Sequence, residues 1–241
     1  MPSWNIHTAH VERLLAENQA HDLGIADTNA FLFGNYVPDV YLGFMVHDTT
    51  YRLDYCLTHN AQPNVIPIPD ADRFWDECIW HRTRKPKSPE VLALTLGAWA
   101  HLAADRIYNA SFREFCETHD TPKGDELRLR KQADFALFGN ALAISSFVEV
   151  TPSLLDAANR FRPYSILPDD VRRAVDVASA ITRSSGPQPQ TETYQLLSDA
   201  WMNGTFDACH EFLTAWLTTW QALVRDDCPA AAIDIRTQAN L

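Results

Sequence analysis

The chain has 241 residues, of which 46% are hydrophobic and 21% charged, and its formal net charge is −11. This composition allows a full hydrophobic core and excludes a disordered chain, and the excess of acid argues against a nucleic-acid backbone as the main partner. The start of the chain has neither a basic segment nor a long apolar run, and no stretch approaches the length of a membrane span. We therefore expect a cytoplasmic protein without a membrane span, which can still bind phosphate through metal ions.

The cysteines are odd in number and widely spaced: Cys56, Cys78, Cys116, Cys209 and Cys228. This pattern fits reduced thiols better than a disulfide framework or a CxxC metal site. We assign them no functional role.

The first two expected helices cover residues 6–17 and 24–34, where apolar residues recur at helical spacing. His7 and His10 lie on one side of the first helix, and the second helix stops at a glycine. A proline then breaks the backbone directly before Asp39, so we expect a turn to present this carboxylate.

Residues 44–69 show no long periodic run and predict an irregular segment with a short helix around residues 51–57. This segment carries His59, and loops on a rigid scaffold often carry ligands. A helix over residues 70–80 follows, and the basic run at 81–87 is expected to be a solvated loop.

The segment from residue 88 to 109 is apolar on nearly every side, yet it holds His101 and Asp105 one helical turn apart. Ser88, followed by proline and glutamate, is typical of a helix start. Because no face is left for water, the helix should be buried, and a buried carboxylate needs an arginine, a hydrogen-bond cage or a metal. The residues allow a structural pair, with Asp105 satisfied by His101 or Arg106, or half of a zinc site.

The rest of the chain continues the helical pattern, and no alternation typical of strands persists. We predict an all-α, single-domain bundle of about ten helices, in which residues 1–150 carry the metal site. The remaining expected helices cover residues 110–118, 121–150, 169–183, 191–202 and 206–225, with a polar linker at 184–190 and a tail at 226–241.

Candidate metal donors follow one another in a definite order: His7, Pro38-Asp39, Thr58-His59 and Gly97-x-x-x-His101-x-x-x-Asp105. In an all-α chain of this length, this order resembles the zinc-dependent phospholipase C family, which is related to zinc nucleases of the S1/P1 type. The resemblance covers roughly residues 1–150 and is strongest in FLFGNYVPDVY and LGAWAHLAADRIYN. It implies a helical bundle of that type, with zinc ions at one end that activate a water to cleave a phosphodiester.

The resemblance also implies roles for individual residues. The family completes its second metal with an N-terminal tryptophan, whereas Trp4 is internal here and offers only its carbonyl. Asp39 would also accept the proton of the attacking water. The implied donors are Asp39, His59, His101 and Asp105 for the first metal, and Asp105 with His7 for the second.

A third metal of the family lacks its ligands in this chain. Asn109 stands where the family has a histidine, and Arg130 and Asp134 are the best match for a histidine and glutamate pair. An arginine stays protonated and cannot bind zinc, but it can bind a phosphate or pair with Asp134. We therefore expect one to two zinc ions, with Arg130 in a substrate-binding role and His119 and His210 as weaker candidate ligands.

The sequence thus predicts a zinc-dependent hydrolase acting on a small phosphate ester or a phospholipid headgroup. One alternative is a non-catalytic helical protein that keeps the fold with a structural metal or none. A closed tetrahedral site would favour that alternative, because a catalytic zinc keeps a position open. Another is an HD-type metal phosphohydrolase, suggested by three dipeptides: His21-Asp22, His47-Asp48 and His119-Asp120.

Overall fold

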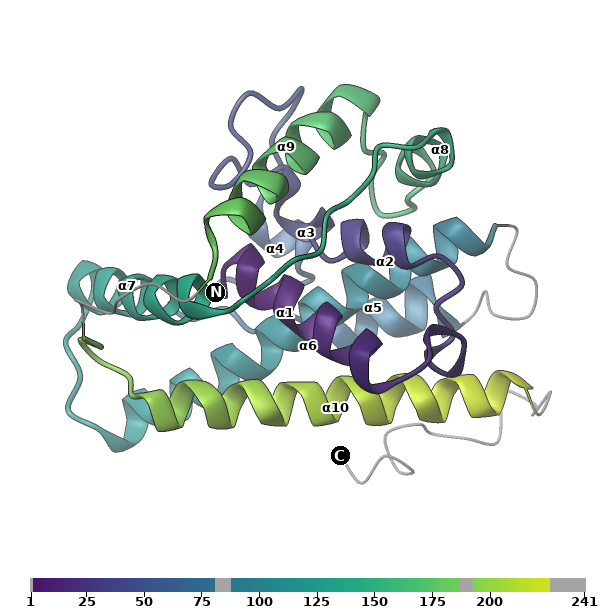
Figure 1. Cartoon of the computed structure of the whole chain (residues 1–241). Coiled ribbons are helices and arrows are strands. Elements are labelled where there is room, and N and C mark those ends of the chain that lie inside the picture. The colour runs from purple at the N-terminus through teal and green to yellow at the C-terminus, as the bar shows by residue number, and fades with distance from the viewer. Residues whose placement is uncertain (1, 81–87, 187–192, 226–241) are drawn as a thin grey trace.

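The computed structural model describes residues 2–80, 88–186 and 193–225, and over these residues it contains ten α-helices and no strand. The all-α prediction is confirmed (Figure 1). The basic run at 81–87, most of the linker, the start of the helix expected at 191–202 and the tail lie outside the described residues. The helices are α1 Trp4–Glu17, α2 Thr28–Gly34, α3 Val37–Val40, α4 Tyr55–Thr58, α5 Ala71–Cys78, α6 Pro89–Thr118, α7 Asp125–Ala141, α8 Pro152–Asn159, α9 Pro168–Ser184 and α10 Asp199–Arg225, with a short 3₁₀ turn, η1, at Ala20–Leu23.

Helix α6 runs through the middle of the structure and is contacted by α2, α3, α5, α8 and α10. Its first turn is capped as the sequence predicts, because the Ser88 hydroxyl accepts a hydrogen bond from the amide of Val91. The prediction of a separate helix over residues 110–118 is wrong. Helix α6 continues unbroken to Thr118, because this stretch has no glycine or proline and the buried Phe112 extends its apolar side.

Two glycines bring α2 and α6 into backbone contact. A Cβ atom added at Gly97 would lie 2.0 Å from the carbonyl oxygen of Phe31, and one at Gly34 would lie 2.1 Å from that of Leu94. Both distances are far below van der Waals contact, so only glycine fits at either position. This close approach sets the loop after α2, beginning at Asn35, directly against α6.

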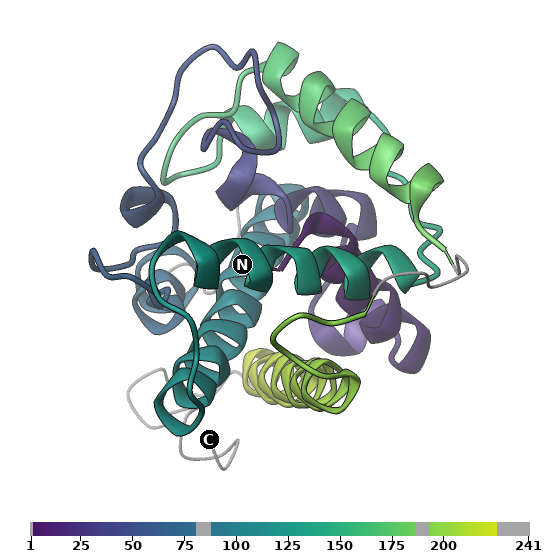
Figure 2. The same cartoon turned by 90° about the vertical axis from the view of Figure 1, so that its left-hand side faces the viewer.

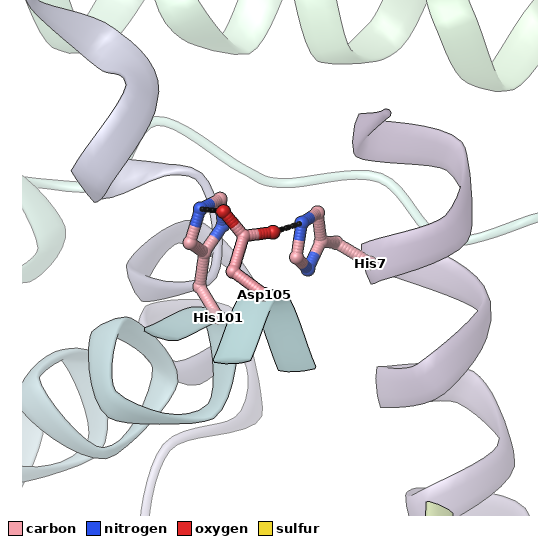
Figure 3. Close-up of side chains that lie close together, drawn as sticks. All are labelled: His7, His101 and Asp105. Atoms are coloured by element: carbon pink, nitrogen blue, oxygen red, sulfur yellow. Dashed lines mark ion pairs between the residues drawn. The ribbon is translucent and has the colours of Figure 1, made fainter. Parts of the chain in front are cut away.

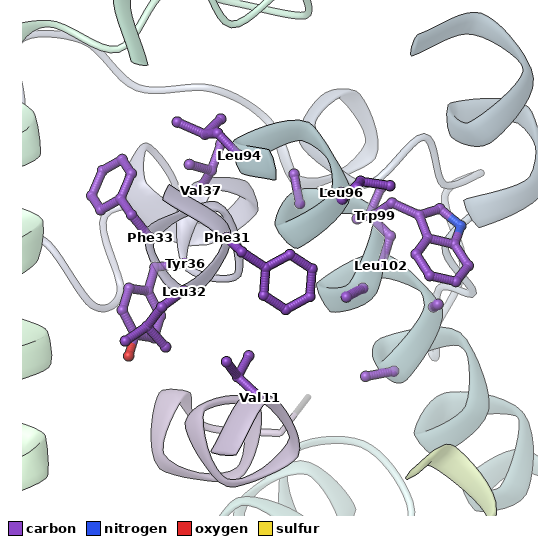
Figure 4. Close-up of a cluster of buried hydrophobic side chains, with 14 of the residues drawn as sticks. Val11, Phe31, Leu32, Phe33, Tyr36, Val37, Leu94, Leu96, Trp99 and Leu102 are labelled. Atoms are coloured by element: carbon purple, nitrogen blue, oxygen red, sulfur yellow. The ribbon is translucent and has the colours of Figure 1, made fainter. Parts of the chain in front are cut away.

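Buried apolar side chains from α1, α2 and α6 fill the space around this contact (Figure 4). Phe31 lies between Val11 of α1 and Leu102 of α6 in this view. The labelled members of the cluster are Val11, Phe31, Leu32, Phe33, Tyr36, Val37, Leu94, Leu96, Trp99 and Leu102.

Helix α10 extends along one side of the molecule in Figure 1 and packs on α6 and α1. Trp216 of α10 meets Trp99 of α6 and Trp75 of α5, with ring centroids 5.7 and 5.5 Å apart. Two helices were expected over residues 191–225, with a break near Gly204, but α10 is continuous through this position. Its buried stripe persists on both sides of the glycine, and this packing outweighs the weak helix propensity of Gly204.

Helix α7 lies across the end of the molecule that faces the viewer in Figure 2 and contacts α1. The helix expected over residues 121–150 is wrong beyond Ala141, because residues 142–151 are not helical. The Glu12 carboxylate accepts hydrogen bonds from the backbone amides of Ser145 and Ser146, which fixes this segment against α1. None of the described helices has the length and apolar character needed to cross a membrane.

Candidate metal centre

Five side chains that the sequence marks as metal donors meet at one buried point. His7 comes from α1, Asp39 from α3 and His59 from the residue that ends α4, while His101 and Asp105 lie one turn apart on α6. Each is at most 3% exposed. Asp39 lies in a short helix, whereas the sequence predicted a turn. The structure therefore brings together side chains that are up to 98 residues apart in the chain, His7 and Asp105.

Two groups of three donors are each close enough to hold a metal ion: Asp39, His59 and His101 form one, and His7, His101 and Asp105 the other, with ligand atoms within 4.8 Å of one another in each group. A tetrahedral ion with Zn–N distances of about 2.0–2.1 Å places its donor atoms about 3.4 Å from one another. His59 Nε2 lies 3.2 Å from His101 Nε2. The remaining contacts are 3.5 Å for His59 Nε2 to Asp105 Oδ2, 3.7 Å for His59 Nε2 to Asp39 Oδ1, 3.8 Å for His101 Nε2 to Asp105 Oδ2 and 3.9 Å for His101 Nε2 to Asp39 Oδ1.

The other carboxylate oxygen of Asp105 faces His7 (Figure 3). His7 Nε2 is 3.4 Å from Asp105 Oδ1, and the His7 ring is stacked on that of His101 with centroids 4.0 Å apart. Among the described residues, His7 Nε2 and Asp105 Oδ1 have no hydrogen-bond partner, and neither has Asp39 Oδ1. Buried polar atoms without partners are costly, and a metal ion is a ligand that would fit these atoms.

Neighbouring groups orient three of the donors. His101 Nδ1 is 2.9 Å from the carbonyl oxygen of Asn35, which only accepts hydrogen bonds, so Nδ1 carries the proton and Nε2 presents its lone pair to the centre. His59 Nδ1 is 2.8 Å from the Thr58 hydroxyl. The indole of Trp4 donates to Asp39 Oδ2 at 3.0 Å, which leaves Oδ1 facing the histidines.

The Trp4 carbonyl, the one group of this residue that the sequence offered as a ligand, accepts a hydrogen bond from the Thr8 hydroxyl at 2.7 Å. Trp4 thus acts through its indole and lies behind Asp39. Sequence reasoning missed this role, and it also missed Asn35, Thr58 and Tyr55. Thr58 is the neighbour of His59 in sequence, which was a usable signal for the contact between these two residues. The other contacts depend on tertiary packing.

Burial controls the protonation of the centre. It is the largest cause that lowers the pKa of His7 to about 4, and it lowers the pKa of His59 well below the usual value. Both rings are therefore neutral, the form that binds metal. Burial also raises the pKa of Asp39. For Asp105 burial acts in the same direction, but the electrostatic interaction with the neighbouring His101 ring and the contact with His7 outweigh it and hold the pKa below its usual range.

Tyr55 lies at the partly exposed side of the centre. Its ring is stacked on that of His59, with centroids 3.9 Å apart, and its hydroxyl is 3.5 Å from Asp105 Oδ2. A surface pocket of about 670 Å³ is lined by Thr58 and by side chains of α5 and the loop around Tyr164. None of the five donors is among the described residues that line it.

Several residues considered in the sequence analysis lie outside the group. Arg130 forms an exposed ion pair with Glu126, and Asp134 accepts hydrogen bonds from the backbone at residues 195–197. The Asn109 amide donates to the carbonyl of Pro67. His119 bonds within its own helix end, His210 pairs with Glu17, and Arg106 pairs with Asp72 rather than with Asp105.

The three His-Asp dipeptides are also apart from the centre. His21, His47 and His119 are exposed, and their dipeptides lie in η1 and in two loops. His21 Nε2 lies 3.3 Å from Asp22 Oδ1, but this pair is exposed and separate from the buried centre.

Comparison with protein-family models, curated proteins and solved structures gives no match to this chain. The interpretation of the centre therefore depends on its residues and their geometry.

Proposed function

We propose that this protein is a metal-dependent hydrolase of phosphate esters, with one zinc ion held by Asp39, His59, His101 and Asp105. The observation that carries the proposal is the set of donor distances of 3.2–3.9 Å, together with the partnerless oxygen of Asp39. A buried carboxylate oxygen without a partner is costly, and a bound cation would offset that cost. A second ion would lie between Asp105 and His7, whose facing atoms also lack partners.

Zinc bound by histidine and aspartate lowers the pKa of a water towards neutrality and attracts the oxygen of a phosphoryl group. The chain supplies a base beside this position. Burial raises the pKa of Asp39, which makes its carboxylate a stronger proton acceptor than an exposed aspartate. Trp4 donates to Oδ2 of this residue, so Oδ1 would hold the ion and a remaining lone pair of Oδ2 would accept the proton of the water.

The acidic composition supports a phosphate substrate bound through metal rather than through surface charge. The formal net charge is −11, and an anionic ester is repelled by such a surface. The order of donors in the chain, which resembles the zinc-dependent phospholipase C family, supports a phosphodiester as the first class to assay.

A second candidate function is a structural metal in a non-catalytic helical protein. The observation that favours it is the complete burial of the donors, because four protein ligands fill the tetrahedron of a zinc ion and leave no position open. In that case the ion would stabilise the junction of α3, α4 and α6 and would not catalyse a reaction.

The first test is the zinc content of the full chain beside His101→Ala and Asp105→Asn. We expect one to two zinc ions in the parent and none in either variant. His210→Ala is the matched control, because His210 is a buried histidine paired with Glu17 outside the centre, and this variant should keep its zinc. A parent that binds no zinc, or variants that bind it as the parent does, would overturn the proposal.

Cobalt substitution separates the two candidate functions. An open centre should change its visible spectrum when inorganic phosphate is added, and the zinc form should hydrolyse bis(p-nitrophenyl) phosphate. A tetrahedral spectrum that phosphate leaves unchanged, with no hydrolysis, would establish the structural role.

A further inference from the structure

Tyr55 contacts the metal centre and also reaches the surface of the protein. The five donors are almost completely buried, whereas Tyr55 is partly exposed. Tyr55 begins α4, and His59 follows it by one helical turn, so the two rings lie on the same side of this short helix. Their nearly parallel stack, with centroids 3.9 Å apart, is thus a local consequence of the helix.

The stack fixes the position of the Tyr55 hydroxyl beside the donor atoms. The hydroxyl oxygen lies 3.5 Å from Asp105 Oδ2. This is the carboxylate oxygen that faces the Nε2 atoms of His59 and His101, at 3.5 and 3.8 Å. A separation of 3.5 Å is at the outer limit of a hydrogen bond and contributes little. The proton of Tyr55 is therefore available to a better acceptor.

Two other hydrogen-bonding side chains beside the centre are already engaged. The indole of Trp4 donates to Asp39 Oδ2 at 3.0 Å, and the Thr58 hydroxyl lies 2.8 Å from His59 Nδ1. Both side chains are buried, and both orient a metal donor. Of these three groups, Tyr55 alone combines a weakly held proton with access to solvent.

A phosphate ester matches this free donor. The non-bridging oxygens of a phosphodiester carry no proton at neutral pH, and ionised carboxylates such as Asp39 and Asp105 only accept hydrogen bonds. A tyrosine hydroxyl keeps its proton well above neutral pH and can donate it to such an oxygen. Because two carboxylates balance the charge of one zinc ion, a hydrogen-bond donor adds to the binding of an anion at the centre.

We propose that the Tyr55 hydroxyl donates a hydrogen bond to a non-bridging oxygen of a phosphate ester bound at the metal centre. A ligand oxygen that binds the ion next to Asp105 Oδ2 would also lie next to this hydroxyl, because the hydroxyl and Oδ2 are neighbours. This inference depends on the proposed function, since the ion must first hold the phosphate. It assigns Tyr55 to substrate binding rather than to holding the ion.

The test is the binding of diethyl phosphate to the zinc-loaded full chain, followed by phosphorus NMR, together with the zinc affinity from competition with a chelator. Tyr55→Phe keeps the ring that stacks on His59 and removes only the hydroxyl. This variant should bind diethyl phosphate about tenfold or more weakly, since a hydrogen bond to a charged group is lost. Its zinc affinity should stay within about threefold of that of the parent.

Tyr51→Phe is the matched control. Tyr51 lies on the same segment between α3 and α5, and its hydroxyl donates to the backbone carbonyl of Ser165, outside the centre. This variant should bind zinc and diethyl phosphate as the parent does.

Different outcomes separate the two proposals. If the parent holds zinc and binds diethyl phosphate, and Tyr55→Phe binds it as tightly, the role of Tyr55 is wrong and the metal centre stands. If Tyr55→Phe loses zinc affinity while its zinc-loaded form binds the diester as the parent does, the hydroxyl supports Asp105 and does not contact the substrate. If the parent holds no zinc, or holds zinc and binds no diester, both proposals fail.

Discussion

Asp134 and Asp105 are both buried aspartates on long helices, and their surroundings differ in kind. The Asp134 carboxylate accepts three backbone hydrogen bonds, at 2.7–2.8 Å, from the amides of Gln195, Leu196 and Leu197. Asp105 contacts three histidine rings and keeps one oxygen without a partner. An acid that serves structure is saturated by fixed donors, whereas Asp105 has room for a further positive ligand. The two residues thus contrast a carboxylate that is saturated by backbone donors with one that could accept a further ligand.

The largest effect should come from Asp134→Ala. Three backbone amides lose their acceptor, and unsatisfied buried groups cost about 1–3 kcal/mol each, so the free energy of unfolding should fall by roughly 3 kcal/mol or more. Urea unfolding measures this loss. Zinc content per folded chain should be unchanged, and a fall in zinc content would contradict the separation of the two aspartates.

Acid should affect the metal-free protein through the buried histidines of the centre. The unfolded pKa of His7 is near 6.5 and the folded pKa is about 4, so the unfolded chain binds more protons between these values. Stability is full above pH 6.5 and should decline as the pH falls towards 4, by an amount on the order of a few kcal/mol. His59 acts in the same direction.

Urea midpoints of the metal-free chain across this pH range test the expectation. His7→Gln should reduce the pH dependence in this window. A decline that is equally steep in this variant would assign the effect to other groups.

The glycine contact between α2 and α6 supports the metal centre, because it positions the carbonyl that orients His101. Gly97→Ala should force the backbones apart and destabilise the fold by about 1–3 kcal/mol, with weaker zinc binding. Gly204→Ala is the control, since no atom lies within 4 Å of its added Cβ. The free energy of unfolding of this variant should rise by about 0.5–1 kcal/mol, because alanine has the higher helix propensity. Thermal unfolding and zinc titration of both variants measure the contrast. Equal behaviour of the two would show that the close contact is not needed.

The smallest effect should come from Trp4→Phe, which removes the hydrogen bond to Asp39 Oδ2 and keeps most of the buried ring. Loss of such an outer partner typically weakens metal binding 10- to 100-fold, and we expect the lower end. Competition with a chelator measures this change. A zinc affinity equal to that of the parent would show that packing alone orients Asp39.

Local sequence patterns were sufficient to predict the first part of α6 and its cap, and to single out His101 and Asp105, because these polar side chains stand out in a helix that is otherwise apolar. The resemblance, rather than a local pattern, suggested that His7, Asp39 and His59 would join them. Local patterns were insufficient where tertiary contacts outweigh local propensity. Glu12 and Asn29 hold residues 142–151 in a non-helical path that the sequence presents as helix. Helix α10 passes through Gly204 because its buried stripe continues.

The position of a side chain around a helix was also beyond the sequence. Arg130 and Lys131 are neighbours, and a helix turns by about 100° from one residue to the next. This rotation lets Arg130 pair with Glu126 and places Lys131 over the ring of Phe112. The different partners of the two side chains could therefore be predicted only from the packing of α7. The indole of Trp4 likewise reaches Asp39 only because α1 and α3 meet in space.

The order of elements along the chain has a consequence for synthesis on the ribosome. All five donors precede residue 106, whereas α10, which packs its tryptophans on α5 and α6, begins at Asp199. Chains emerge from their N-terminal end, so a nascent chain presents the complete donor set well before this last helix is made. During that interval Trp75 and Trp99 lack their cover, and the growing chain exposes an apolar surface that chaperones recognise.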